Sequence, residues 1–145
     1  METAIRHAQL SDFERIYELI NELEETVFDI EKQRAIFIEN LTSKNNIYLV
    51  ATEEDKVIAF LSCHVQLLLH HCGKVGEIVE MVVDSPFRKQ GIGEQLISEI
   101  IKLAKEADIE TLEVTSNNRR EKAHRFYEKA GFSQTHQKFT LLLKS

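Results

Sequence analysis

The sequence has few of the residues that mark disulfide-rich or proline-rich chains. Its 145 residues include no tryptophan, one proline and two cysteines. Two cysteines do not suggest a disulfide framework, so Cys63 and Cys72 are expected to be reduced. No internal repeat, low-complexity segment or linker interrupts the chain. Residues 1–145 are therefore expected to form a single domain.

Long apolar runs and a positive charge balance are also missing. No apolar run approaches membrane-spanning length, and the first residues, METAIRHAQLSD, lack the apolar core of a signal peptide. The cytoplasm is therefore the expected location. The formal net charge of -6 argues against a general nucleic-acid binder, which normally has a basic surface. Any site for a polyanion must be local.

What the sequence does contain is an alternation of helical and strand patterns. Apolar residues recur at steps of three and four in the expected helices Phe13–Leu23, Glu31–Leu41, Ile92–Ala107 and Glu121–Lys129. Short apolar stretches bounded by turns predict strands at Thr3–His7, Ile47–Thr52, Val57–Leu69, Gly76–Val83, Thr111–Thr115 and within Phe132–Leu143. The expected architecture is a mixed α/β sheet with helices on it.

Two of the helices carry more detailed expectations. Ser11 and Glu14 have the spacing of a capping box, which predicts that a helix starts there. In the second helix, Ile36, Phe37 and Leu41 are expected on one side.

The most informative stretch is Gly76–Gly93, GEIVEMVVDSPFRKQGIG. It reads as a strand, then a basic loop with two glycines, then the start of an amphipathic helix. Backbone N–H groups of a first helical turn, together with nearby cations, favour an anion such as a pyrophosphate. Because Glu94, Gln95 and Leu96 follow Gly93, neither a Walker loop nor a dinucleotide fingerprint is present.

The strand before this loop carries two acids. Because side chains alternate along a strand, Glu77 and Glu80 are expected on opposite faces of the sheet. An alkylamine with a pKa of about 10.4 is neutral in about one molecule in a thousand or fewer at neutral pH. A buried carboxylate that takes the proton removes part of this cost. Either acid could act as a general base, or lie at a strand edge facing water or an arginine.

Two segments resemble the GNAT N-acetyltransferases. Met81–Gly93 resembles the acetyl-CoA loop, Arg/Gln-x-x-Gly-x-Gly/Ala, after a strand that ends in an apolar-x-Val-x-Pro-like run. Ala123–Phe132 resembles the helix Ala-x-x-Phe/Leu-Tyr-x-x-x-Gly-Phe, in which the Tyr faces the CoA sulfur. The resemblance covers nearly the whole chain. It implies a GNAT-type α/β (α+β) fold with a mixed, mostly antiparallel central sheet of six to seven strands and about four helices.

The resemblance also implies that acetyl-CoA is the cosubstrate. The residues implied in binding it are Met81, Val82, Val83, Arg88, Lys89, Gln90, Gly91, Ile92, Gly93, Glu94, Asn117 and Tyr127. The family's usual Asn three residues before Ala123 is Arg120 here, so the corresponding contact is carried over to Asn117.

Three residues receive catalytic roles from the resemblance. Glu77 matches the general base of histone acetyltransferases in the superfamily, and Glu80 matches an acid of sugar-phosphate acetyltransferases; Glu77 is favoured. An unpaired strand amide at Met81 or Val82 would bind the oxyanion of the tetrahedral intermediate. Tyr127 would protonate the departing thiolate or hydrogen-bond to it, although a tyrosine packed in the core would show the same spacing.

Within the superfamily the chain is most similar to the aminoalkylphosphonate N-acetyltransferases, in His64–His71, Gly76–Val83 and Ala123–Tyr127. This likeness implies an acceptor that is a small primary amine with an anionic group. The side chains expected to meet that acceptor are Arg34, His64, His70 and Lys138. The segment 24–29 either holds the acceptor or only joins two helices.

The one cluster that could hold a metal consists of His64, His70, His71, Cys72 and His136. Adjacent residues of a strand point in opposite directions, so a tight structural metal site is not expected. A loosely bound divalent metal that bridges a phosphonate stays open.

The predicted function is direct transfer of an acetyl group from acetyl-CoA to a primary amine in a ternary complex. The alternatives are another acceptor, such as a polyamine, an aminoglycoside or a protein amine, and a CoA-binding module without catalysis. The presence of Glu77, Glu80 and Tyr127 speaks against the second alternative. No nucleic-acid or membrane partner is expected, and the apolar segment Phe139–Leu143 could pair across a homodimer.

Overall fold

The computed structural model describes residues 3–115 and 121–144. The chain divides into two compact units, Met1–Thr115 and Ser116–Ser145. The strands found among the described residues all belong to the first unit.

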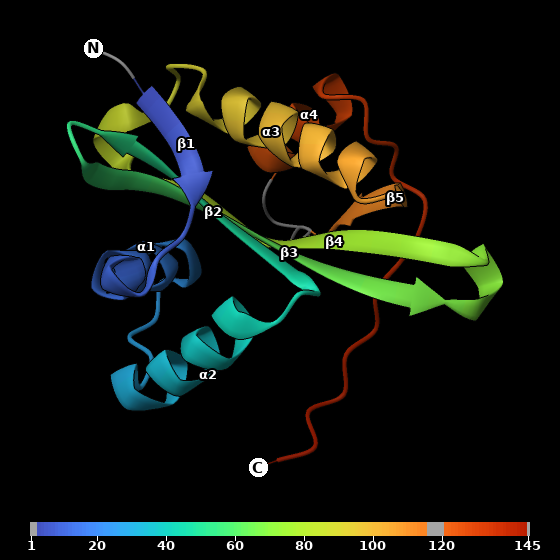
Figure 1. Ribbon diagram of the computed structural model, residues 1–145, viewed down its shortest axis with the longest axis horizontal. Coiled ribbons are helices and arrows are strands. Elements are labelled where there is room, and N and C mark those ends of the chain that lie inside the picture. The colour runs from blue at the N-terminus through green and yellow to red at the C-terminus, as the bar shows by residue number, and fades with distance from the viewer. Residues whose placement is uncertain (1–2, 116–120, 145) are drawn as a thin grey trace. The chain divides into compact units, whose positions relative to one another are not determined.

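Five strands form the sheet of the first unit. They are β1 (Thr3–His7), β2 (Asn46–Glu53), β3 (Lys56–Leu68), β4 (Gly73–Val83) and β5 (Ile109–Val114). Their order is β1-β2-β3-β4-β5, and neighbours are antiparallel except for β4 and β5, which are parallel as expected. The β3–β4 hairpin extends beyond the other strands of the sheet (Figure 1).

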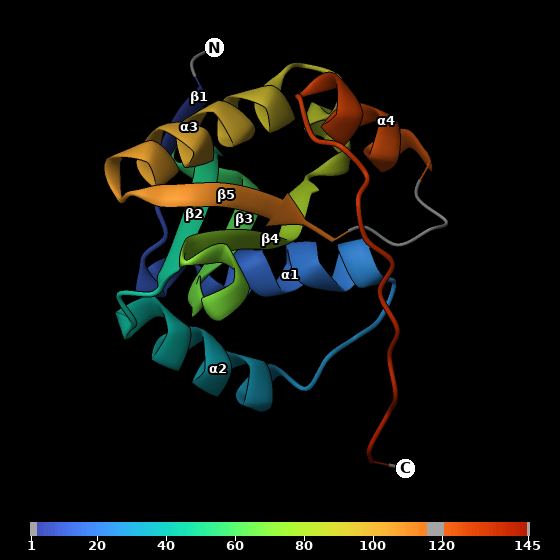
Figure 2. The same cartoon turned by 90° about the vertical axis from the view of Figure 1, so that its right-hand side faces the viewer.

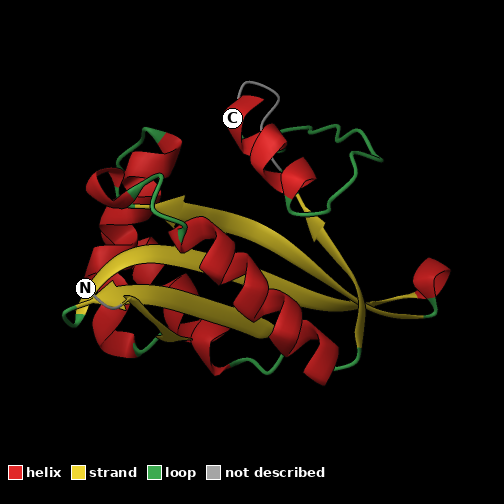
Figure 3. Cartoon of the chain, turned by 90° about the horizontal axis from the view of Figure 1, so that it is seen from above, coloured by secondary structure: helices red, strands yellow, loops and turns green. Residues whose placement is uncertain are grey.

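Three helices cover the two faces of this sheet. The helices α1 (Phe13–Glu24) and α2 (Ile30–Thr42) lie on one face, and α3 (Ile92–Glu106) lies on the other (Figure 1 and Figure 2). Seen from above, α3 crosses over the strands on its way from β4 to β5 (Figure 3). In the part of the chain that the structure describes, no helix is both long and apolar enough to cross a membrane.

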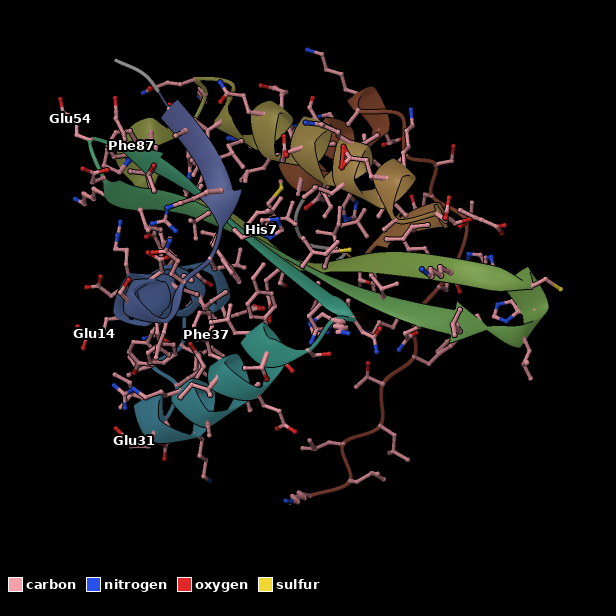
Figure 4. All side chains as sticks on the ribbon, viewed as in Figure 1. His7, Glu14, Glu31, Phe37, Glu54 and Phe87 are labelled. Atoms are coloured by element: carbon pink, nitrogen blue, oxygen red, sulfur yellow. The ribbon has the colours of Figure 1, made fainter. Side chains whose placement is uncertain are left out.

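An aromatic cluster joins α1 and α2 to the sheet. The ring centroid of Phe37 is 5.4 Å from that of Phe13 on α1 and 5.6 Å from that of Tyr48 on β2. Phe37 lies between α1 and α2 (Figure 4). Ile36, expected on the same side, is 56% exposed. With 3.6 residues per turn, Ile36 lies about 140° around the helix from Leu41, so the two do not share a face.

The start of α1 differs from the expected capping box of Ser11 and Glu14. A capping box forms instead at the short 3-10 turn Leu10–Asp12 just before α1, where Asp12 accepts the backbone N–H of Gln9 at 2.7 Å. Asp12 also accepts the guanidinium of Arg6 at 2.7 Å. Burial raises the pKa of Asp12, but the hydrogen bonds from Arg6 and Gln9 together lower it by more than burial raises it. The pKa of Asp12 is therefore below its ordinary value. This charged contact ties β1 to the beginning of α1.

The second unit contains α4 (Glu121–Lys129), which ends in a Schellman motif. The N–H of Phe132 donates to the carbonyl of Tyr127 at 3.0 Å, and that of Gly131 to the carbonyl of Glu128 at 3.1 Å. Gly131 has a φ of 105°, which a residue without a Cβ adopts readily. The rings of Tyr127 and Phe132 pack against each other across this motif, with their centroids 5.9 Å apart. The expected helix and its glycine end are confirmed.

The sheet has fewer strands than the sequence predicts. Six to seven were expected, and the described residues form five. Residues 133–144 belong to no helix or strand, and the apolar side chains of Phe139 and Leu141 are 90% and 81% exposed. Apolar content alone predicted strands here, but a strand also needs a partner for its backbone groups. The mixed, mostly antiparallel α/β class with four helices is confirmed.

Candidate active site

The sheet opens along one side of β4. Pairing with β5 ends at Ile78 and Val114, whereas pairing with β3 on the other side continues to Val83. Within residues 3–115, no strand lies beside Val79–Val83 on the β5 side. This open edge comes directly before the loop that leads to α3.

A β-bulge in β4, on the side that pairs with β3, lies next to the point where β4 and β5 separate. Ser62 of β3 lies opposite Glu80, and the next residue, Cys63, lies opposite Ile78. Val79 is therefore an extra residue of β4 without a partner on β3. One extra residue reverses the side to which all the following residues point.

The bulge brings both acids of β4 to one face of the sheet. Glu77 lies opposite His64 and Glu80 opposite Ser62, and these two β3 residues are two apart, so they share a face. The following Val82 belongs to the hydrophobic cluster under α1 and α2, which identifies the face. The expectation that Glu77 and Glu80 lie on opposite faces is wrong, because a regular alternation does not anticipate the bulge.

The carboxylate of Glu80 is held from the β3 side. The hydroxyl of Ser62 donates to Oε1 of Glu80 and accepts the backbone N–H of Glu80 at 3.0 Å. Tyr48 lies nearby, and its OH accepts a hydrogen bond from Asn40 at 2.8 Å. Burial raises the pKa of Tyr48, and the negative charge of Glu80 raises it further. A cavity of about 120 Å³ adjoins Tyr48 and Asn40.

The carboxylate of Glu77 lies on the β5 side. Its Oε2 accepts a hydrogen bond from Oγ1 of Thr115, just after β5, at 2.9 Å. In the parallel pairing, Glu77 is level with Glu113 of β5, so two carboxylates are neighbours on this face. Burial, together with the charge of Glu77, raises the pKa of the Cys63 thiol to about 11. Glu77 thus lies where β4 and β5 separate.

One of the two candidate amides for the oxyanion faces the open edge. The N–H of Glu80 points toward β3, since it donates to Ser62. Successive N–H groups of a strand point to alternate sides. The N–H of Met81 therefore points to the open side of β4, and that of Val82 points back toward β3.

The loop after β4 uses its arginine in an unexpected way. Nε of Arg88 donates to the carbonyl of Val83 at 2.9 Å, and its terminal nitrogen donates to Oε1 of Glu22 on α1 at 2.9 Å. The guanidinium thus joins the end of β4 to α1. Lys89, beside it, is exposed and has a φ of 64°.

The start of α3 offers backbone donors. Gly91 is the N-cap residue with a φ of 82°, and no side chain caps the helix. The N–H groups of its first turn have no partner inside the helix and lie at the positive end of its dipole. A Cβ at Gly91 would lie 3.2 Å from Oε2 of Glu94, and the positive φ would strain any residue that has one. These features fit the diphosphate of CoA.

The strand pairing places one expected acceptor residue, His64, on the face of the acids. The ring of His64 is 6.2 Å from that of Tyr48 and lies opposite Glu77. Arg34 instead lies over the ring of Phe13 at 5.1 Å.

The other expected residues lie elsewhere in the chain. His70 is in the short turn Leu69–His71 at the end of the β3–β4 hairpin, with its ring 4.5 Å from that of His71. Lys138 and Tyr127 belong to the second unit, and Asn117 lies outside the described residues.

A metal site is not assembled by the described side chains. Among residues 3–115 and 121–144, no group of three or more His, Cys, Asp or Glu side chains could hold a metal ion. Cys63 is a buried free thiol and Cys72 an exposed one. The fifth member of the expected cluster, His136, lies 2.6 Å from the hydroxyl of Thr135.

Two hydroxyl residues that contact the acids, Ser62 and Thr115, were not predicted from the sequence. For Ser62 a signal existed, since it is a serine within a long apolar stretch, IAFLSC, and it is 0% exposed. A buried hydroxyl needs a partner. For Thr115 no comparable signal existed, because a threonine at the end of a strand is common.

Known proteins resemble this chain in sequence and in fold. An aminoalkylphosphonate N-acetyltransferase of Salmonella typhimurium is 39% identical over 139 residues, which are 96% of this chain and 90% of that protein. A solved chain from Bacillus halodurans C-125, described as a transcriptional regulator, has a TM-score of 0.90 at 25% identity, and the match covers 98% of this chain and 100% of that one. Glucosamine-6-phosphate N-acetyltransferase from Arabidopsis thaliana has a TM-score of 0.82 at 25% identity, covering 99% and 100%.

The comparison with protein families agrees with the geometry of β4, the loop after it and the start of α3. Residues 13–132 match the acetyltransferase (GNAT) family, whose enzymes use acetyl-CoA as cosubstrate. The matched range includes β4, the bulge, the loop and α3. The chain therefore belongs to the GNAT family of acetyltransferases.

Proposed function

We propose that this acetyltransferase transfers the acetyl group of acetyl-CoA to the primary amine of an aminoalkylphosphonate, directly and in a ternary complex. The observation that carries the proposal is the common face of Glu77 and Glu80 at the open edge of β4. The acceptor class rests on the Salmonella relative, which is named for it and covers nearly the whole chain.

The cosubstrate would bind along the path from α3 to β4. The uncapped first turn of α3, with Gly91 as N-cap, suits the diphosphate, and Lys89 is the exposed cation beside it. Arg88 contributes indirectly, since its hydrogen bonds to Val83 and Glu22 hold the loop at the end of β4. Residues 81–83 and 90–94, with Asn117 and Tyr127, complete the proposed set. Acetyl-CoA itself supplies the activated acetyl group.

Glu77 is the favoured general base. Removing the proton from an alkylamine at neutral pH costs about 4 to 5 kcal/mol, and a positioned carboxylate offsets part of this. Glu77 lies where β4 and β5 separate and has one described partner, Thr115. Glu80 is held from the opposite side by Ser62. We assign Glu80 to orienting the ammonium group on the same face.

The remaining steps need a donor for the oxyanion and an acid for the leaving thiolate. The N–H of Met81 is the proposed oxyanion donor, because it points to the open edge whereas that of Val82 does not. Tyr127 is the proposed acid, through its hydroxyl. The match of 13–132 to one family spans both units, which supports 1–145 as a single catalytic domain.

Further parts of the proposal concern the acceptor and its surroundings. His64 is the acceptor contact with the best support, since it lies on the face of the acids. Arg34, His70 and Lys138 are weaker candidates. A loosely held divalent ion that bridges the phosphonate would add positive charge on the face where Glu77 and Glu80 are negative. A cytoplasmic homodimer is the proposed state in the cell.

The test is release of free thiol from acetyl-CoA, measured against a panel of amines. The proposal expects release with aminoalkylphosphonates that depends on the amine and is strongly reduced by Glu77→Gln. Faster turnover of a polyamine or an aminoglycoside would replace the acceptor class but keep acetyl transfer. Release without any amine, or with none of the panel, would contradict amine acetylation.

A further inference from the structure

Ser62 is a polar residue in the middle of an apolar strand. It is 0% exposed, as are its neighbours Leu61 and Cys63. A buried hydroxyl without a hydrogen bond destabilises the folded state, because it has lost its contacts with water. Such a residue is expected in a buried strand only where its hydroxyl has specific partners.

Both partners of Ser62 belong to a single residue across the strand. The Ser62 hydroxyl contacts Oε1 of Glu80 and accepts the backbone N–H of Glu80 at 3.0 Å. The oxygen therefore accepts from the main chain and donates to the side chain of the same glutamate. This arrangement limits both the backbone direction and the rotamer of Glu80.

The contact lies at the place where the ladder between β3 and β4 is interrupted. Val79 is the extra residue of the bulge, and Glu80 is the first residue after it. A bulge leaves backbone groups without their regular partners. At Glu80 a side-chain hydroxyl accepts the main-chain N–H next to this interruption.

We infer that Ser62 is a positioning residue for acetyl transfer, acting through Glu80. Its hydroxyl holds the Glu80 carboxylate on the face that carries Glu77. The inference rests on the proposed function, since it assigns Ser62 a role in the same site. Ser62 itself does not touch the substrate or the reacting atoms.

The choice of hydroxyl residue follows from this geometry. A carbonyl or amide side chain would be too large for a position that is 0% exposed. Alanine fits the space but removes the hydroxyl that accepts the N–H of Glu80 and donates to its carboxylate. Ser62→Ala is therefore the informative substitution, and Cys63→Ala is its matched control. Cys63 is the next residue, is equally buried and points to the other face.

The first experiment measures kcat and KM in a double-mutant cycle of Ser62→Ala and Glu80→Gln. Ser62→Ala is expected to lower kcat about tenfold, with KM for both substrates changed by less than about twofold. In the Glu80→Gln background, Ser62→Ala should lower kcat by less than about twofold, because its effect passes through the Glu80 carboxylate. Cys63→Ala should leave kcat unchanged. An equal loss in both backgrounds, or an equal loss for Cys63→Ala, would overturn the inference.

The second experiment does not require turnover. Amide hydrogen exchange followed by NMR in wild type and Ser62→Ala reports on the N–H of Glu80 directly. Exchange of this amide should become at least about tenfold faster in Ser62→Ala, and not in Cys63→Ala. Unchanged exchange at Glu80 would reject the inference even if the protein acetylates amines. Absence of activity with every amine, together with faster exchange, would instead reject the proposed function while keeping the contact.

Discussion

Glu77 and Glu80 differ in the surroundings of their carboxylates. Glu77 accepts from Thr115 at the end of β5, whereas Glu80 is held by Ser62 within the sheet. A base must release its proton after each cycle, which favours the carboxylate at the open edge. An orienting group benefits from being fixed.

The first prediction compares the two acids. Glu77→Gln should lower kcat/KM about 10²- to 10³-fold, because the substitution removes the proton acceptor and keeps the shape. Glu80→Gln should lower it less. Glu113→Gln is the control, since Glu113 is level with Glu77 and carries the same charge, and it should retain activity within about threefold. A larger loss for Glu80→Gln than for Glu77→Gln would exchange the two roles.

The second prediction concerns Tyr127. Tyr127→Phe removes the hydroxyl but keeps the ring that packs against Phe132 at 5.9 Å. We expect kcat to fall by about tenfold or more with little change in KM, because a general acid acts only in the transition state. A variant with the kcat of the wild type would remove the acid role from Tyr127.

The third prediction uses the two thiols. Burial, with the charge of Glu77, raises the pKa of Cys63 to about 11, while Cys72 is exposed. Because this value lies above the unfolded value of about 8.5, the contribution of Cys63 to stability is present below about pH 8.5 and is lost as the pH rises toward about 11.

Titration with a thiol-reactive dye at about pH 8 should therefore modify one thiol in the folded protein and both after unfolding. Cys72→Ser should abolish the fast reaction. Rapid modification of both thiols in the folded protein would show that Cys63 is not protected.

At the scale of elements, the junction of β4 and α3 combines a bulge, an open edge and a helix start. Gly91 is the residue on which the helix start depends, because its φ of 82° is unfavourable for residues with a Cβ. A left-handed conformation costs a non-glycine residue about 1–2 kcal/mol.

The fourth prediction separates this strain from charge. Gly91→Ala and Gly91→Glu both introduce the strain, and Glu adds a negative charge close to Glu94 and to the proposed diphosphate. We expect KM for acetyl-CoA to rise by about tenfold in Gly91→Ala and by clearly more in Gly91→Glu. The readout is KM together with the protection that CoA gives against heating. Equal values for the two variants would mean that no anion binds at this turn.

The elements were largely predictable from the sequence, and the bulge was not. The stripes of α1 and α3 and the pattern of β2 to β5 follow from side-chain periodicity. The bulge at Val79 depends on the register with β3, and nothing about a valine in an apolar strand indicates an extra residue. The assignment of Glu77 and Glu80 to opposite faces failed for this reason. The residues themselves were found because acids in an apolar strand are unusual.

At the scale of the whole molecule, the C-terminal segment is the main difference between expectation and structure. Leu142 and Leu143 are 81% and 88% exposed, and the segment has no strand partner among the described residues. An exposed apolar segment of this kind is a template for pairing with another chain. Apolar content predicted a strand here, but a strand also needs a partner for its backbone groups, and the local sequence does not specify one.

The fifth prediction follows from this exposure. Light scattering should give the mass of a dimer for the wild type, and Leu142→Lys should shift it to a monomer, because a charge in an apolar pairing surface is costly. Leu67→Lys is the control, since Leu67 is 78% exposed on the β3–β4 hairpin and should leave the mass unchanged. A wild-type monomer at all concentrations tested would contradict the dimer.

The bulge in β4 is proposed to place two carboxylates beside the thioester of acetyl-CoA, while the diphosphate of the same molecule lies at the start of α3. A crystal structure of the protein grown with CoA tests it most directly. We predict density for the diphosphate at the first turn of α3, with the sulfur beside the N–H of Met81 and both Glu77 and Glu80 on the same side of it. Density for the diphosphate away from Gly91, or a pantetheine arm along another strand, would contradict the claim.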